Sequence, residues 1–217
     1  SDNSSLLPPN LKFLQLFPDS GRYDVIREEN MKTSSLDSLQ LQSMDFIKLD
    51  IQGMELEAFK GGENLLDKCL GVESEVQFVS LYDGACSFED LSLFLKDKGF
   101  VFIDFIKIKR WSRDNISNNL GQCIWADALF LRSPEYICSL NDPDILEKYI
   151  VISLMYNKFD LIDFLISHSE NNTKELTKFS TSLKSIRRKN KNLNNLKKGI
   201  ELLYRTVDSN SKLHFLN

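Results

Sequence analysis

The chain has 217 residues, of which 42% are hydrophobic and 27% charged, and its formal net charge is −4. This length suits one large domain, or one domain with an appendage, and the hydrophobic fraction is enough for a sizeable core. The negative charge argues against nucleic-acid binding through global charge, no apolar run approaches the roughly 20 residues of a membrane span, and no signal peptide is visible, so we expect a cytoplasmic protein without a transmembrane segment.

The first 43 residues offer only short elements. Residues 1–10 contain the Pro8-Pro9 pair and are expected to form a tether, and residues 11–17 form a brief amphipathic segment before a turn. Residues 23–31 are expected to be extended, as an edge strand or a half-exposed strand, and residues 35–39 a short helical turn. Because the sequence begins at Ser1 without an initiator Met, we expect a fragment of a longer reading frame.

The most informative stretch is residues 44–62. The apolar run FIKL at 46–49 ends at Asp50, and Gly53 then opens a helical segment at 54–60. A short apolar run followed at once by a turn and a helix is typical of a buried parallel strand in an α/β sheet. Ligands of such sheets bind in the crevice beyond the carboxyl ends of the strands. We therefore expect the functional site at the polar cluster that follows this strand: Asp50, Gln52, Gly53 and Glu55.

Strand and helix signals continue to alternate downstream. The pattern predicts a helix at 63–69, a strand with one polar face at 72–81, a helix from Ser87 to Lys98, and strands at 101–108 and 123–131. Ser87 is the expected N-cap of its helix, and Gly99 the residue that ends it. The last two strands are joined by a polar loop and are expected to pair antiparallel. The fold class is therefore α/β, the closing part of an open sheet.

Beyond Pro134 the sequence loses its strand signals. Apolar residues recur at helical spacing in 143–155, 159–167, 174–184 and 195–207. We place a boundary near Ser133 and expect an α/β domain at 1–134 and an all-helical appendage at 135–217. A basic run in the appendage favours a solvated helix face, with contact to an anionic surface or a protein partner as the alternative: Lys184, Arg187, Arg188, Lys189 and Lys191.

The acidic residues of the central stretch allow two interpretations. Asp50, at the end of a parallel strand, could bind a metal, accept a proton from a substrate hydroxyl or hold a ligand's polar groups. Glu55, in the first turn of the next helix, is kept ionised by the helix N-terminus. The plainer interpretation is that Asp50 caps the turn and Glu55 complements the helix dipole. Lys48 needs a carboxylate or carbonyl partner, and a salt-bridged core lysine is favoured over a catalytic one.

Other candidate groups are less specific. Glu73 and Glu75 share one face of the next strand and either extend the acidic crevice or form a solvated or ion-paired face. Trp111 and Trp125 are expected to pack in the core or at its rim. Four widely spaced cysteines are expected to be free thiols of a reducing compartment: Cys69, Cys86, Cys123 and Cys138. Two histidines, His168 and His214, lie in the appendage, so we expect neither a catalytic triad nor a metal site.

Four segments occur in order along the chain: DFIKLDIQGMELEAFKGGENLL, GVESEVQFVSLY, SFEDLSLFLKDKGF and GQCIWADALFLR. Together with SSLLPPN and TSSLDSL upstream, they resemble the FkbM-type family of S-adenosylmethionine-dependent methyltransferases, over residues 4–134. The resemblance implies a Rossmann-like (class I) methyltransferase sheet and methyl transfer from S-adenosylmethionine, usually to oxygen. Acceptors in the family are often sugars or polyketide-type metabolites, so a small-molecule or glycan acceptor is implied.

The resemblance maps Asp50, Gln52, Gly53 and Glu55 onto the acidic motif beside the methyl-transfer site. Asp50 and Glu55 are then the catalytic candidates, and Gln52, Gly53, Glu73 and Glu75 the candidates for binding substrate or cofactor. Gln52 stands where many members carry Glu. The family's glycine-rich loop and its ribose-binding acid have no counterpart before Met44, where Gly21 is the sole glycine. We therefore expect a partial sheet that lacks most of the cofactor cradle.

Three hypotheses remain open. In the first, the chain is the C-terminal part of a methyltransferase, and Asp50 and Glu55 position or deprotonate an acceptor hydroxyl; proximity and in-line orientation then supply most of the catalysis. In the second, it is a non-catalytic binding or assembly module derived from a methyltransferase, with a partner for its helical tail. The third, a nucleotide-sugar enzyme of another Rossmann-like type, would need a D-x-D pair, which Asp50-Ile51-Gln52 does not provide.

Overall fold

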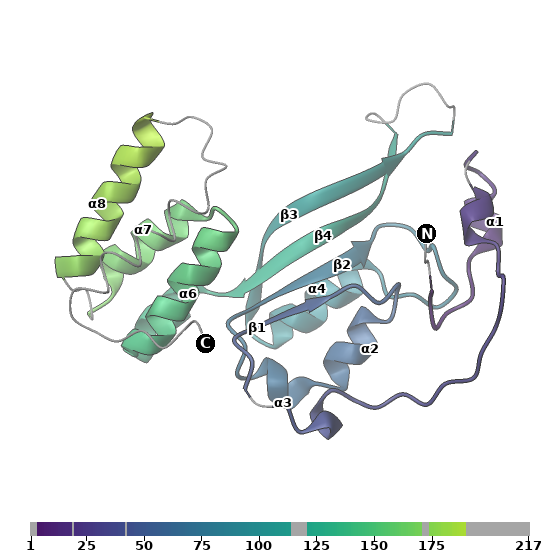
Figure 1. The fold of residues 1–217 in the computed structure, drawn as a ribbon, viewed down its shortest axis with the longest axis horizontal. Coiled ribbons are helices and arrows are strands. Elements are labelled where there is room, and N and C mark those ends of the chain that lie inside the picture. Colours follow the sequence, from purple (N-terminus) through teal and green to yellow (C-terminus); the bar gives the residue numbers. More distant parts are fainter. Residues whose placement is uncertain (1–3, 19, 42, 114–120, 171–173, 190–217) are drawn as a thin grey trace. The chain divides into compact units, whose positions relative to one another are not determined.

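The computed structural model describes residues 4–18, 20–41, 43–113, 121–170 and 174–189 (Figure 1). The chain divides into two compact units, Ser1–Arg132 and Ser133–Asn217. The first unit is a mixed α/β structure, and its helices and strands are, in chain order, α1 (Leu11–Leu14), η1 (Ser20–Tyr23), η2 (Asp37–Leu39), β1 (Phe46–Leu49), α2 (Glu55–Lys60), α3 (Glu63–Leu66), β2 (Gly71–Gln77), α4 (Phe88–Asp97), β3 (Phe100–Trp111) and β4 (Gln122–Arg132).

One four-stranded sheet organises this unit, with strand order β1-β2-β4-β3 (Figure 1). β1 and β2 are parallel, which requires the crossover that α2 and α3 provide. β4 is antiparallel to both of its neighbours, β2 and β3. The predicted parallel strand after Asp45 and the predicted antiparallel pairing of the last two strands are confirmed. The carboxyl ends of β1 and β2 therefore lie at the same edge of the sheet.

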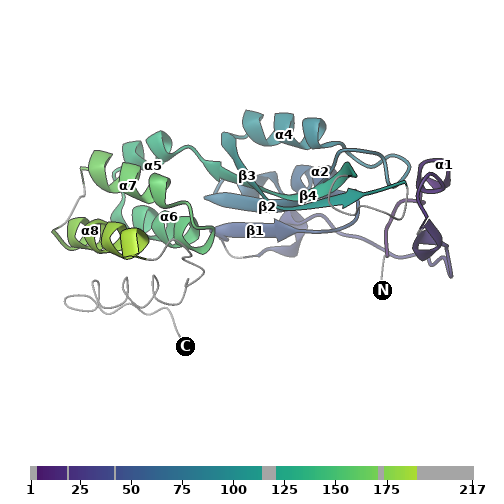
Figure 2. The same cartoon turned by 90° about the horizontal axis from the view of Figure 1, so that it is seen from above.

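One face of the sheet is apolar and packs against the helices. Ile47, Val72 and Phe130 belong to one buried cluster with side chains of α2, α3 and α4, among them Phe59, Leu66, Leu91 and Leu95. Figure 2 shows α2 and α4 on the same side of the sheet. Ser87 caps α4 as predicted, in a capping box with Asp90, and Gly99 ends it at a φ of +84°.

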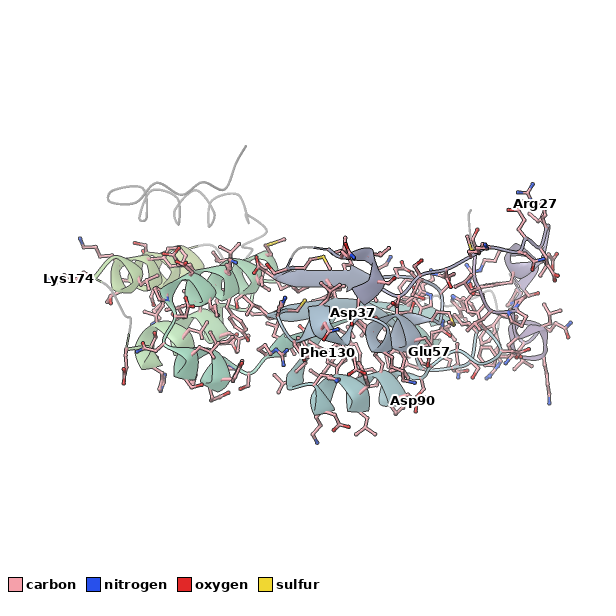
Figure 3. The ribbon with its side chains drawn as sticks, turned by 90° about the horizontal axis from the view of Figure 1, so that it is seen from below. Arg27, Asp37, Glu57, Asp90, Phe130 and Lys174 are labelled. Carbon is pink, nitrogen blue, oxygen red and sulfur yellow. The ribbon has the colours of Figure 1, made fainter. Side chains whose placement is uncertain are left out.

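The predicted edge strand at 23–31 is wrong. Tyr23 lies in η1, and residues 24–35 form neither helix nor strand. Ile26 is 99% exposed, and Arg27 pairs with Glu29 along the same segment instead of with a sheet (Figure 3). A run of adjacent charges gives this segment too little apolar surface to bury against a neighbouring strand.

The predicted tether at 1–10 is also wrong for the residues that the structure describes. Asn10 Nδ2 donates to Ser80 O, and its backbone N–H donates to Leu81 O. Pro9 forms an isolated antiparallel bridge with Tyr82. Pro8 and Pro9 cannot donate to a ladder, but their carbonyl groups still accept, and Asp83 N–H donates to Pro8 O. The segment is therefore fastened to the chain that follows β2.

The described residues of the second unit are helical, with no strand among them. They form α5 (Pro134–Leu140), α6 (Pro143–Met155), α7 (Phe159–His168) and α8 (Lys174–Lys189). Three of the four helices predicted beyond Pro134 are confirmed, with ends shifted in α7 and α8; the fourth, 195–207, lies outside the described residues, as do Lys191 and His214. Helix α5 was not predicted, although Ser133 caps it and Pro134 begins it. No helix in the described parts of the chain is long and apolar enough to cross a membrane.

Candidate functional site

The chain leaves β1 through a tight turn, residues 50–53, which we call the Asp50 turn. Asp50 is exposed at the carboxyl end of β1. Gln52 has a φ of +57° and Gly53 a φ of +102°. A left-handed conformation is uncommon for a residue with a side chain, and such strained residues cluster at functional sites. The turn is therefore held in its shape by its surroundings.

Glu55 holds the turn from inside. Its side chain is 1% exposed. Its carboxylate accepts hydrogen bonds from Ile51 N (2.9 Å to Oε1) and Gly53 N (3.0 Å to Oε2). Burial raises the pKa of Glu55, and the hydrogen bonds from backbone N–H groups oppose that rise. The geometry makes Glu55 a positioning group for the Asp50 turn, while the direct role predicted for it stays a prediction.

Gln52 connects the exposed acid to the interior. Its Nε2 donates to Asp50 Oδ1 at 2.8 Å, and its Oε1 accepts from the hydroxyl of Tyr82 at 2.8 Å. Its backbone oxygen accepts from Ser5 Oγ at 3.0 Å. A carboxylate at position 52 could not donate to Asp50, so the amide performs a task here that a Glu could not. The turn is thus tied to the N-terminal segment and to the loop after β2.

Gly53 is packed against the same loop. A Cβ atom at this position would lie 2.8 Å from Ala85 Cβ and 3.3 Å from Leu7 Cδ1. The glycine predicted from the sequence therefore meets two requirements, a positive φ and a close approach of neighbouring side chains.

Strand register sets a row of ionisable side chains across the sheet next to the turn. Leu49 is the register partner of Ser74, so the residues that follow them, Asp50 and Glu75, lie beside one another. In the strand register, Glu75 lies opposite Asp127 of β4, and Asp127 lies opposite Lys107 of β3. We call these four side chains the acidic row: Asp50, Glu75, Asp127 and Lys107.

Glu75 is the most perturbed member of the acidic row. Its side chain is 6% exposed, and burial, followed by the charges of Asp50, Glu55 and Asp127, raises its pKa from 4.5 to about 8. Burial also raises the pKa of Asp127, which Lys48 and Lys107 oppose. A carboxyl group that stays protonated at neutral pH can donate a hydrogen bond, unlike its ionised neighbours.

Glu73 differs from Glu75 although both are buried on the same face. Glu73 forms an ion pair with Lys48, one strand away. The partner predicted for Lys48 is confirmed, but its side chain is 58% exposed, so it is not a core lysine. The interpretation of this face as ion-paired thus holds for Glu73, and the face is not solvated at either glutamate.

Three polar residues of this region were missed. Gln77 is buried, and its Nε2 has no hydrogen-bond partner in the described part of the structure. Tyr82 is buried in an aromatic cluster with Tyr23 and Trp111, and burial raises the pKa of its hydroxyl. Asp127 was a visible signal, because a carboxylate inside an apolar strand is partly removed from water and needs a reason to be there. Trp111 packs in the core as predicted, at 9% exposure.

Three expectations concern features that the described residues lack: a metal site, disulfide bonds and a cofactor cradle. Among the residues that the structure describes, no group of three or more His, Cys, Asp or Glu side chains is arranged to bind a metal ion. The four cysteines are free, as predicted. Upstream of β1, the described residues form neither a strand nor a strand–loop–helix unit that could cradle a nucleotide.

Comparison with known families gives one match. Residues 2–102 match the family model described as the methyltransferase FkbM domain. Neither the comparison with curated proteins nor that with solved structures gave a match. The resemblance seen in the sequence is confirmed over this range, which includes β1, β2, the Asp50 turn and α4 and ends within β3; the likeness of the later segment is not part of the match.

Proposed function

We propose, from the match of residues 2–102 to the family model described as the methyltransferase FkbM domain, that the chain supplies the acceptor side of a site that methylates a hydroxyl group. The observation that carries the proposal is the Asp50 turn: an exposed carboxylate at the carboxyl end of a parallel strand, oriented by a hydrogen bond from the Gln52 amide. In open α/β sheets this edge is where ligands bind. A sugar or another small hydroxylated metabolite is the acceptor class that fits the family.

The residues of the Asp50 turn and their hydrogen-bond partners would have different roles. Asp50 would accept a hydrogen bond from the acceptor hydroxyl and fix the direction of its oxygen, or take its proton. Gln52 and Tyr82 would keep the Asp50 carboxylate in one orientation, since both of their hydrogen bonds are short. Glu55 would keep the turn itself in place. Methyl transfer depends mainly on alignment of the reacting atoms, so a rigid turn would supply a large part of the rate.

The methyl donor that the family implies is S-adenosylmethionine. The described residues do not fit a complete cradle for it, because no strand, glycine-rich loop and helix precede β1 among them. What they do supply is the acceptor-facing edge, in a sheet that we propose to be part of a Rossmann-like one. The chain by itself is therefore expected to bind the cofactor weakly or not at all, and calorimetry with S-adenosylmethionine and S-adenosylhomocysteine measures this. Micromolar affinity would contradict it.

The activity itself is tested by transfer of a radioactive methyl group from S-adenosylmethionine, at millimolar concentration, to a panel of monosaccharides and polyols. We expect Asp50→Asn to lower the transfer about 100-fold, the scale of a lost proton acceptor. Asp97→Asn, at an exposed position on α4, is the matched control and should keep the wild-type rate.

The lack of a complete cradle among the described residues also favours a second function. If no acceptor of the panel is methylated and none of them binds to the chain in calorimetry, the chain is a binding or assembly module derived from a methyltransferase, and the methyltransferase proposal fails. If methyl transfer occurs but Asp50→Asn is as active as the wild type with its fold intact, Asp50 is a turn residue and the acceptor lies elsewhere.

A further inference from the structure

Glu75 is surrounded by charged groups from every element that packs against it. Asp50 follows β1, Glu55 begins α2, Asp127 lies on β4 and Lys107 on β3, and Tyr82 in the loop after β2 is also within electrostatic range. One row back along the strands, the neighbouring pair is Lys48 and Glu73. Of these groups, Lys107 is the cation that acts on Glu75, and it also faces Asp127.

An ionised Glu75 would stand between two other carboxylates. Asp127 is the register partner of Glu75 on β4, and Asp50 follows β1 on the other side of Glu75. Like charges at neighbouring positions of paired strands are destabilising. Burial of Glu75 weakens the screening of these repulsions by water. With a proton on Glu75, the middle position of the row is neutral and both repulsions disappear.

Of the residues in the acidic row, Asp50 can be displaced most easily. Glu75 and Asp127 lie within strands that are hydrogen-bonded to each other. Asp50 lies beyond the last residue of β1, is exposed, and belongs to a turn with a left-handed Gln52. Strained residues persist only where their surroundings hold them. Repulsion in the row would therefore displace the Asp50 turn before it displaces β2 or β4.

We propose that Glu75 is a positioning residue that holds the Asp50 turn in place by carrying a proton, and that loss of this proton releases the turn. The high pKa of Glu75 agrees with this role, because it keeps the group neutral at physiological pH. The inference rests on the proposed function in one respect, that Asp50 is the group facing the acceptor. Alkaline conditions would then dismantle the acceptor side of the site while the sheet remains folded.

The test measures solvent exchange of the Ile51 and Gly53 amides by NMR in the whole chain without ligand, at pH 6.5 and pH 9. These two N–H groups are bonded to Glu55 and report directly on the turn. After correction for base-catalysed exchange, we expect their protection to fall about tenfold or more in the wild type, while amides in the β2–β4 ladder keep theirs. In Glu75→Gln, whose neutral amide mimics the protonated acid, protection should be the same at both pH values.

Glu57→Gln is the matched control, because Glu57 is exposed on α2 and pairs with Lys60 (Figure 3). It should behave as the wild type. Equal protection at both pH values in the wild type, or an equal fall in Glu75→Gln, overturns the proposal.

If Glu75→Gln does not fold, the wild type alone still tests the proposal. The measurement is then a carbon NMR titration of its side-chain carboxyl groups. A Glu75 midpoint near 8 that coincides with shifts of the Ile51 and Gly53 amides supports the proposal, and a midpoint below 6 overturns it. Neither measurement depends on methyl transfer, so failure here leaves the proposed function standing, and the absence of methyl transfer leaves these results unchanged.

Discussion

Replacing Gly53 and Gly84 separates two constraints on a turn glycine, backbone strain and close packing. Its φ of +102° disfavours any side chain, and a Cβ would also lie 2.8 Å from Ala85 Cβ. Gly84 has a φ of +83°, but a Cβ added there would meet no atom within 4 Å. We expect Gly84→Ala to lower the free energy of unfolding by about 1 kcal/mol through backbone strain, and Gly53→Ala by about 2–4 kcal/mol because overpacking is added. Urea unfolding of both variants measures the difference, and equal losses would show that the contact with Ala85 relaxes freely.

Glu75 makes stability depend on pH. Its pKa is about 8 in the folded chain and near 4.5 when it is unperturbed, so between these values the unfolded chain releases a proton that the folded chain keeps. The stability that this group contributes is therefore full below pH 4.5 and is lost as pH rises toward 8. At about 1.4 kcal/mol per pKa unit, the loss is at most about 5 kcal/mol.

The variant Glu75→Gln should remove most of this dependence. Burial raises the pKa of Glu55 and of Asp127 as well, so a smaller decline of the same sign remains. Urea unfolding at pH 5, 7 and 8.5 is the measurement. A decline in the variant as steep as in the wild type would mean that Glu75 is already ionised in the folded chain.

Among the structural elements, β4 ends in a side chain that joins two of the three helices on the apolar face, α3 and α4. Arg132 is 9% exposed; its Nε donates to Cys69 O at 3.0 Å and its Nη2 to Leu66 O at 2.8 Å, while Nη1 donates to Lys98 O. The guanidinium also lies 4.1 Å from the centre of the Phe100 ring. Leu66 O and Lys98 O belong to the C-terminal ends of α3 and α4, where a cation is favourable.

We expect Arg132→Met to lower the free energy of unfolding by about 2–5 kcal/mol, because it leaves several buried carbonyl groups without their donor. Arg132→Lys should lose part of this amount, since an ammonium cannot reach diverging carbonyls as a planar fork does. Arg110→Met, at an exposed position on β3, is the control. Chemical unfolding of the three variants tests the order, and an Arg132→Met chain as stable as the control would contradict it.

The strands also show how far element-level prediction reaches. Apolar runs located β1, β3 and β4 because the signal for each strand lies in its own residues, although most residues of β3 are exposed. The alternation in β2 correctly predicted one polar face, but burial of that face depends on Asp127 and Leu129, which the register brings from β4. No local pattern contains that pairing. For the same reason the high pKa of Glu75 and the role of Tyr82 could not be predicted, although the position of the Asp50 turn could.

For the whole molecule, the sequence predicted the change from α/β to helical structure, because strand signals end where helical spacing begins. Prediction from the sequence failed where the conformation of a segment depends on contacts with residues far away along the chain. Residues 4–10 contain two prolines and look unanchored, yet they bond to the loop after β2, about 70 residues away, through contacts such as that between Asn10 and Ser80. Residues 24–35 have extended character but find no strand to pair with.

The division near Ser133 leads to a prediction about folding. Both buried clusters of the first unit are built from residues that precede 132, and all four strands lie there. Arg132 anchors the end of β4 to carbonyl groups of that same unit. We therefore expect a chain that stops after Ser133 to fold on its own, with cooperative urea unfolding and dispersed amide resonances. A chain that stops after Leu131 loses the guanidinium and should be less stable by an amount close to that of Arg132→Met. A shortened chain that keeps Arg132 but shows no cooperative transition would mean that the first unit needs the helices of the second unit to fold. The two compact units would then not be independent folding units.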